Sequence, residues 1–171
     1  MGKPVFLTGY MASGKTTIGK KLARLLNYEF IDTDELIESM AGKSVQQIFE
    51  SEGEDSFRQL EHSVIVSLTH RINTVISTGG GTPCYFDNMQ RMNKSGITVY
   101  IRMAPQSIIK RLKSAKEPRP LVKRIPESEL PDFINRHLQQ RSEFYEMARL
   151  QIKGESIDIE ELARSIKNLN F

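Results

Sequence analysis

The sequence predicts an α/β fold, a three-layer sandwich in which helices cover both faces of a central sheet of five parallel strands. Two observations support this prediction. Short runs rich in β-branched and aromatic residues alternate with longer stretches of helical periodicity, a pattern typical of parallel strands joined by crossover helices. A glycine-containing turn, residues 9–16, separates the first such run from the first helical stretch, as in proteins that bind phosphate groups.

The expected elements follow in chain order. The strands are the short apolar runs at residues 4–8, 29–31, 74–77, 97–101 and 150–152. Helical stretches fill the intervals between the first three runs, at residues 16–26, 34–40, 45–52 and 55–69. The first of these helices has Ile18, Leu22 and Leu26 on one face, as a helix packed against a sheet requires.

Length and composition fit one domain spanning residues 1–171. The chain is 39% apolar and 26% charged, which is typical of a folded protein. Its single cysteine, Cys84, cannot close an internal disulfide, so nothing requires an oxidising compartment. The apolar stretch at residues 5–12 is interrupted by Thr8 and Gly9, and we expect no membrane partner. We expect a cytoplasmic monomer.

The charge balance weakly favours anionic partners. The 24 Lys and Arg residues against 21 Asp and Glu residues leave a formal net charge of +3, which a phosphorylated metabolite would suit as well as a nucleic acid. No basic run is interleaved with aromatic residues, so we expect no nucleic-acid partner. Basic residues and prolines do gather at residues 114–127, which predicts a mobile basic loop; a solvated connector would have the same composition.

Residues 9–16, GYMASGKT, match the phosphate-binding pattern G-x-x-x-x-G-K-[ST] at every position. The glycines let consecutive backbone N–H groups converge on a phosphate, and the N-terminus of the following helix adds partial positive charge. Lys15 can reach the terminal phosphates, and Thr16 can coordinate Mg²⁺. The motif therefore predicts binding of a nucleoside triphosphate.

Two carboxylates follow the second expected strand, at the sheet edge where ligands bind in parallel α/β folds. We interpret Asp32 as the end of the strand and Thr33 or Asp34 as the start of the next helix. Asp34 could be an N-cap of that helix. Alternatively, a phosphoryl transfer to a hydroxyl would use one carboxylate near Mg²⁺ and another at the acceptor oxygen.

Glycines and arginines complete the candidate site. Three glycines, residues 79–81, follow the third expected strand and suit a close approach of backbone to ligand, although a simple turn also uses glycine. Arg58 lies three residues before Glu61, so an i,i+3 pair could orient its guanidinium; a plain surface ion pair is the alternative.

These residues together resemble the shikimate kinase family over nearly the whole chain. Besides the phosphate loop, the resemblance rests on residues 30–34 (FIDTD), Ile48 and Phe49, Gly53 and Glu54, Phe57 and Arg58, residues 79–81, residues 119–121 (RPL), and Arg141 with Tyr145. It implies a fold like that of the phosphate-loop nucleoside monophosphate kinases. It also implies a magnesium-requiring kinase that uses ATP to phosphorylate the 3-hydroxyl of shikimate, giving shikimate 3-phosphate and ADP in chorismate and aromatic amino acid biosynthesis.

The resemblance also implies roles for individual residues. Shikimate would be bound by Asp34, Arg58, Gly79, Gly80, Gly81 and Arg141, with both arginines on its carboxylate and Asp34 as base or positioning group for the 3-hydroxyl. ATP would contact Gly9, Ala12, Ser13, Gly14, Lys15, Thr16, Thr17, Arg111 and Arg119. Lys15, Asp34 and Arg119 would be catalytic, and Thr16 and Asp32 would hold Mg²⁺. Residues 114–127 would form a lid, and residues 33–61 an acceptor-binding helical region.

Two features depart from the family pattern. Ala12 stands where the family often has glycine, and residues 152–156, expected near the adenine, match only loosely. Two other functions compete with the favoured one. A kinase of the same architecture could act on gluconate or a nucleoside monophosphate, although arginines facing Asp34 favour a carboxylated polyol, which gluconate also is. A non-catalytic nucleotide switch is the alternative from another class.

Overall fold

The computed structural model describes residues 2–115 and 121–169, and the other residues lie outside this description. Within the described part, five strands form one sheet in the order β2-β3-β1-β4-β5, and every neighbouring pair is parallel. The strands are β1 (Val5–Thr8), β2 (Glu29–Asp32), β3 (Thr74–Ser77), β4 (Ile97–Arg102) and β5 (Leu150–Lys153). The fold class predicted from the sequence is confirmed.

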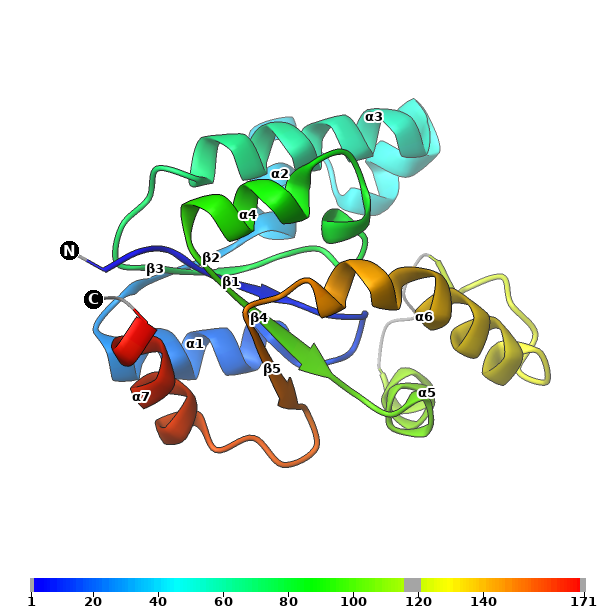
Figure 1. Ribbon diagram of the computed structural model, residues 1–171. Coiled ribbons are helices and arrows are strands. Elements are labelled where there is room, and N and C mark those ends of the chain that lie inside the picture. The colour runs from blue at the N-terminus through cyan, green and yellow to red at the C-terminus, as the bar shows by residue number, and fades with distance from the viewer. Residues whose placement is uncertain (1, 116–120, 170–171) are drawn as a thin grey trace.

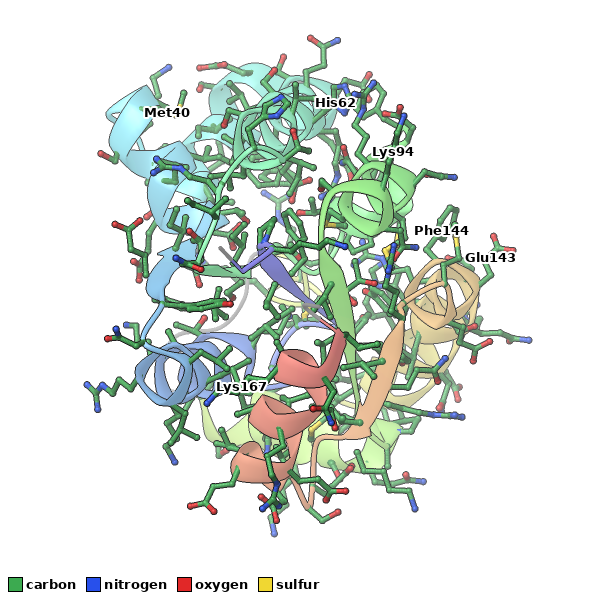
Figure 2. All side chains as sticks on the ribbon, turned by 60° about the vertical axis from the view of Figure 1, so that its left-hand side comes forward. Met40, His62, Lys94, Glu143, Phe144 and Lys167 are labelled. Carbon is green, nitrogen blue, oxygen red and sulfur yellow. The ribbon has the colours of Figure 1, made fainter. Side chains whose placement is uncertain are left out.

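Helices cover both faces of this sheet (Figure 1). They are α1 (Lys15–Leu26), α2 (Thr33–Ala41), α3 (Val45–Leu68), α4 (Asn88–Ser95), α5 (Pro105–Ser114), α6 (Leu130–Glu146) and α7 (Ile159–Leu169), with a short 3-10 helix η1 (Thr82–Cys84). Helices α1 and α7 lie on one face and α3 and α4 on the other (Figure 1). Figure 2 labels Lys94 on α4 and Lys167 on α7, on opposite sides of the sheet. No helix of the described residues is long and apolar enough to cross a membrane.

The central strand β1 is buried along its whole length, as expected for a parallel strand covered on both faces. Its successive side chains point to opposite faces. Phe6 joins the apolar cluster beneath α3, α4 and α6, whereas Leu7 joins the cluster beneath α1 and α7. Two well-packed layers therefore hold the sheet, and the loops at its carboxyl edge are built on a rigid support.

The register brings three loops to that edge. Strand β3 pairs with β1 and β2, with Ser77 opposite both Leu7 and Asp32. The turn after β1, the start of α2 and the glycine loop after β3 therefore leave neighbouring strands at the same level. This arrangement gathers most of the residues singled out in the sequence.

Helix α3 contains a break that agrees with the two helices predicted at residues 45–52 and 55–69. Gly53 has φ 84° and ψ 173°, a backbone conformation outside the helical region. The first part of α3 begins beside α2, where the Val45 N–H donates to the Glu38 carboxylate, and the second part carries Arg58 and Glu61. The break at Gly53 lets one continuous segment pack against α2 and also position Arg58 and Glu61.

Candidate active site

The turn after β1 folds around the side chain of Lys15. Its Nζ is buried and donates hydrogen bonds to the backbone carbonyls of Gly9 and Tyr10, at 2.8 and 2.9 Å. Gly14 has φ 91°, which glycine adopts without a steric penalty, and it leads the chain into α1. The turn therefore surrounds the N-terminus of α1, where the helix dipole favours a bound anion. The expected nucleotide contacts gathered here are Gly9, Ala12, Ser13, Gly14, Lys15, Thr16 and Thr17.

Ala12 has a left-handed backbone, with φ 59°. A side chain in this region costs roughly 1–2 kcal/mol, so the loop stores some strain at this position. The Ala12 carbonyl accepts a hydrogen bond of 3.0 Å from the guanidinium of Arg111 on α5. Arg111 therefore lies against the phosphate loop, on the side away from the glycine loop of β3.

A hydroxyl and a carboxylate meet beside this loop. Thr16 Oγ1 donates a hydrogen bond of 2.8 Å to Asp32 Oδ2. The other carboxylate oxygen, Oδ1, accepts from the backbone N–H of Asp34 at 3.0 Å, so Asp32 is the N-cap of α2. The alternative that made Asp34 the N-cap is therefore wrong.

The Thr16 and Asp32 pair fits Mg²⁺. Hard oxygen ligands suit this ion, which usually takes one or two protein ligands and completes its shell with phosphate oxygens and water. No cluster of three or more His, Cys, Asp or Glu side chains able to hold a metal occurs in the described part of the chain. The hydroxyl of Thr16 and the carboxylate of Asp32 are a donor set that suits an ion shared between the protein and a nucleotide.

Asp34 lies beside the glycine loop that follows β3. The backbone N–H of Gly79 donates to Thr33 Oγ1 at 3.0 Å, which ties the loop to the start of α2. A Cβ on Gly79 would approach Asp34 Oδ1 within 3.0 Å and crowd Glu61 more closely. A residue without a side chain is required here because carboxylates from α2 and α3 converge on its backbone.

Arg58 is buried in a cage of carboxylates and aromatic rings. It forms ion pairs with Glu61 at 2.6 Å and Glu54 at 2.9 Å, and its guanidinium lies 4.2 Å from the ring centre of Tyr85. Burial alone would raise the pKa of Glu54, but hydrogen bonds from Arg58 and Tyr85 outweigh it and hold that pKa below its usual range. The expected i,i+3 pair with Glu61 is present, and a surface ion pair is excluded because Arg58 is only 6% exposed.

The glycine loop also accommodates this cage. A Cβ on Gly81 would overlap the guanidinium of Arg58, and a Cβ on Gly80 would lie 3.2 Å from the backbone nitrogen of Met11. The loop thus contacts Arg58 on one side and the phosphate loop on the other. A simple turn would not need glycines that lie so close to Arg58 and to the backbone of Met11.

Arg141 reaches the same region from α6. It is 7% exposed, and its guanidinium lies 5.8 Å from the ring centre of Tyr10. Among the described residues no carboxylate lies within ion-pair distance of Arg141. Burial raises the pKa of the Cys84 thiol to about 11, and the positive charges of Arg141 and Arg58 both oppose this shift. Both guanidinium groups therefore lie near Cys84, just after the glycine loop, where their charges favour an anion.

Several residues around the site were not identified as such from the sequence. Glu54 holds Arg58, and its i,i+4 spacing from that arginine could have indicated the pair. Tyr85, which stacks on Arg58, and the hydrogen-bonded pair of Tyr10 and His137 had no local signal. Arg119 and the middle of the expected lid, residues 116–120, lie outside the described residues.

Comparisons with known proteins agree on one family. Residues 11–169 match the family model described as shikimate kinase. The shikimate kinase of Phocaeicola vulgatus is 45% identical over 154 residues, which cover 90% of this chain and 88% of that protein. That of Parabacteroides distasonis is 43% identical over 166 residues, covering 97% and 96%.

Solved structures extend the agreement to the fold. The crystal structure of shikimate kinase from Bacteroides thetaiotaomicron superposes with a TM-score of 0.89 at 40% identity, covering 99% of this chain and 98% of that one. Shikimate kinase from Acinetobacter baumannii in complex with shikimate gives 0.87 at 33% identity, covering 99% and 93%. A gluconokinase from Sinorhizobium meliloti gives 0.60 at 14% identity, over 99% and 95%, which is a likeness of fold alone.

Proposed function

The chain belongs to the shikimate kinase family and has the kinase activity of that family in the shikimate pathway, and we propose that it transfers the γ-phosphoryl group of ATP to the 3-hydroxyl of shikimate. The products are shikimate 3-phosphate and ADP. One observation supports the assignment of the acceptor: two buried arginines, Arg58 and Arg141, both lie near Cys84, just after the glycine loop and at the sheet edge that also holds the phosphate loop.

The arginines supply a site for a carboxylate. The charge of Arg58 is balanced by Glu54 and Glu61, which keeps its guanidinium fixed in a buried position. Arg141 has no such carboxylate partner among the described residues, so the shikimate carboxylate would become its counter-ion. Charge-assisted, bidentate contacts of this kind bind and orient a planar carboxylate.

Asp34 serves the other end of the acceptor. It stands at the start of α2, next to Gly79, and strand β3 lies between its preceding strand β2 and the strand β1 that leads into the phosphate loop. From there its carboxylate accepts a hydrogen bond from the 3-hydroxyl and orients the attacking oxygen toward the γ-phosphorus. Asp32, and not Asp34, caps the helix, so this role for Asp34 does not conflict with helix capping.

On the nucleotide side of the site, positive groups offset the negative charge of the phosphates. Lys15 lies within the phosphate loop, and Thr16 with Asp32 would hold Mg²⁺, which when bound offsets negative charge on the β- and γ-phosphate oxygens. In this proposal Arg111 contacts the nucleotide from α5, and the lid at residues 114–127 carries Arg119 to the phosphoryl group and excludes water.

A coupled ADP-release assay tests the proposal. With ATP and Mg²⁺, the purified protein should turn over shikimate and neither gluconate nor AMP. Asp34→Asn keeps the size of the side chain and leaves the Asp32 cap intact, yet turnover should fall about 10²–10⁴-fold because a positioned carboxylate supplies that much. Removal of Mg²⁺ by EDTA should abolish turnover.

Two outcomes would contradict the proposal. Equal or faster turnover of gluconate or AMP would reassign the acceptor. Near-normal turnover by Asp34→Asn, in a protein with unchanged thermal stability, would remove Asp34 from the chemistry and leave only the nucleotide half of the site.

A further inference from the structure

Tyr10 belongs to the phosphate loop, and its side chain is buried and contacts helix α6. Its hydroxyl lies 2.7 Å from Nδ1 of His137, and the two rings meet edge to face with centroids 5.4 Å apart. The backbone carbonyl of Tyr10 accepts from Lys15 Nζ. A single residue therefore contacts the lysine that serves ATP and the helix that carries Arg141.

Both members of the pair are uncharged at neutral pH. Burial raises the pKa of Tyr10 to about 12, so the phenol keeps its proton. Burial, together with the positive charges of Arg141 and Arg58, lowers the pKa of His137 to about 4, so the imidazole is neutral. Tyr10 and His137 therefore share a neutral hydrogen bond whose donor is set by the tautomer of His137.

Helix α6 is attached to the site at two points, one turn on either side of Arg141. His137, Arg141 and Tyr145 follow one another at four-residue spacing and share one face of the helix. The Tyr145 hydroxyl donates to the carbonyl of Gly80 at 2.5 Å. Glu143, on the other side of the helix, points to solvent (Figure 2). The buried face is thus anchored to the phosphate loop at His137 and to the glycine loop at Tyr145.

We propose that Tyr10 and His137 are positioning residues for the phosphoryl transfer: their hydrogen bond holds α6 against the phosphate loop, so that Arg141 binds the acceptor carboxylate in register with the donor phosphate. Neither residue touches the reacting atoms. The inference rests on the proposed role of Arg141. It assigns a catalytic consequence to a hydroxyl that packing alone does not require, since phenylalanine would fill the same space.

Removal of the hydroxyl tests this role. Tyr10→Phe and His137→Leu should each lower kcat/KM for shikimate about 3- to 10-fold, the effect of one lost hydrogen bond, while KM for ATP stays within about twofold. The double variant should be no worse than either single variant, because both remove the same interaction. His137→Gln keeps a hydrogen-bonding group for the Tyr10 hydroxyl, so its kcat/KM for shikimate should be closer to that of the wild type than the value for His137→Leu. Tyr28→Phe, at the opposite edge of the sheet, is the matched control and should match the wild type.

The outcomes separate this inference from the function on which it rests. If Arg141→Ala raises KM for shikimate but Tyr10→Phe and His137→Leu leave all kinetic constants unchanged, the pair is structural and the inference is wrong. If Arg141→Ala has no effect on shikimate, the proposed acceptor site itself fails. Should Tyr10→Phe not fold, the comparison of His137→Leu with His137→Gln decides: equal kinetics in these two variants overturn the inference.

Discussion

Among the residues of the proposed acceptor site, Arg58 is held in place by compensation of its charge. A buried guanidinium loses its hydration, and isolated it would destabilise the fold by several kcal/mol. Arg58 avoids this through Glu54 and Glu61, and Glu61 in turn accepts a hydrogen bond from the buried hydroxyl of Thr82. The result is a positive group held in a fixed position, so, in the proposed function, less entropy would be lost when shikimate binds.

His137 gives the stability of the protein a pH dependence. The folded chain protonates His137 only near a pKa of about 4, whereas an unfolded chain does so near the ordinary value of 6.5. Between these values the unfolded state binds more protons, so the free energy of unfolding decreases as the pH falls through this window. His137→Gln removes that contribution and should lose less stability than the wild type over the same window.

Urea unfolding at several pH values within this window measures the effect. His70→Gln, at an exposed histidine on the far edge of the sheet, is the control and should follow the wild type. Parallel curves for the wild type and His137→Gln would show that the folded and unfolded states protonate His137 alike, contrary to this prediction.

How far single residues could be predicted depends on whether their function is local in the chain. The phosphate loop was recognised because it consists of consecutive backbone groups with a lysine at a fixed spacing. Tyr10 occupies a position of that motif where any residue is accepted, and its partner His137 is 127 residues away. No spacing rule connects the two, so the pair becomes visible only when the sheet order brings α6 beside the loop.

Among the secondary-structure elements, α3 shows what a sequence pattern can and cannot predict. Two helices, residues 45–52 and 55–69, follow from the apolar periodicity, and Gly53 does separate them in the structure. The angle between the two parts depends on how each packs, one against α2 and the other beside α4, and no local pattern contains that information. The same applies to the strands, whose positions were predicted but whose order comes from tertiary packing.

Substitution of Gly53 should destabilise the protein through the backbone alone. At φ 84° and ψ 173° the backbone is in a region essentially reserved for glycine, whereas Gly42, at φ 64° and ψ 19°, is in the left-handed helical region that other residues enter at lower cost. A Cβ would meet no other atom within 4 Å at either position. Gly53→Ala should therefore lower the free energy of unfolding by about 1–3 kcal/mol, and Gly42→Ala by less, about 1 kcal/mol.

Denaturant unfolding of the two variants and the wild type provides the comparison. The two glycines are a matched pair because a Cβ at either position would enter open space and because both terminate or interrupt a helix. A Gly53→Ala variant as stable as the wild type, or more stable than Gly42→Ala, would mean that the break in α3 does not require glycine.

For the whole molecule, the strand order separates the two proposed substrate sites. Strand β1 lies between β3 and β4, so its phosphate loop has the glycine loop of β3 on one side and the β4–α5 connection, followed by Arg111 on α5, on the other (Figure 1). In the proposed function, acceptor residues come from the β2 and β3 side, and nucleotide contacts come from the phosphate loop and the β4 side. Arg141 is the exception, because α6 follows β4 and α5 in the chain but returns to the acceptor side, where Tyr10 and Gly80 anchor it.

This separation predicts that the two binding halves fail independently. A ligand that binds only the folded state stabilises it by RT ln(1 + [L]/Kd), about 2.7 kcal/mol at one hundred times Kd. Arg141→Ala and Arg58→Ala should lose most of the thermal stabilisation by shikimate while keeping that by Mg²⁺·ADP. Lys15→Met should lose phosphoryl transfer and keep stabilisation by shikimate, because the acceptor groups are on other loops.

Arg58→Ala leaves Glu61 buried without its arginine partner, so the thermal stability of this variant without ligand should fall. Arg141→Ala is therefore the better test of ligand binding. Thermal unfolding of each variant, alone and with each ligand, measures these stabilisations, and the ADP-release assay measures phosphoryl transfer. Loss of both ligand responses in Arg141→Ala, with an unchanged baseline, would show that the halves are one cooperative site and would contradict the separation by strand order.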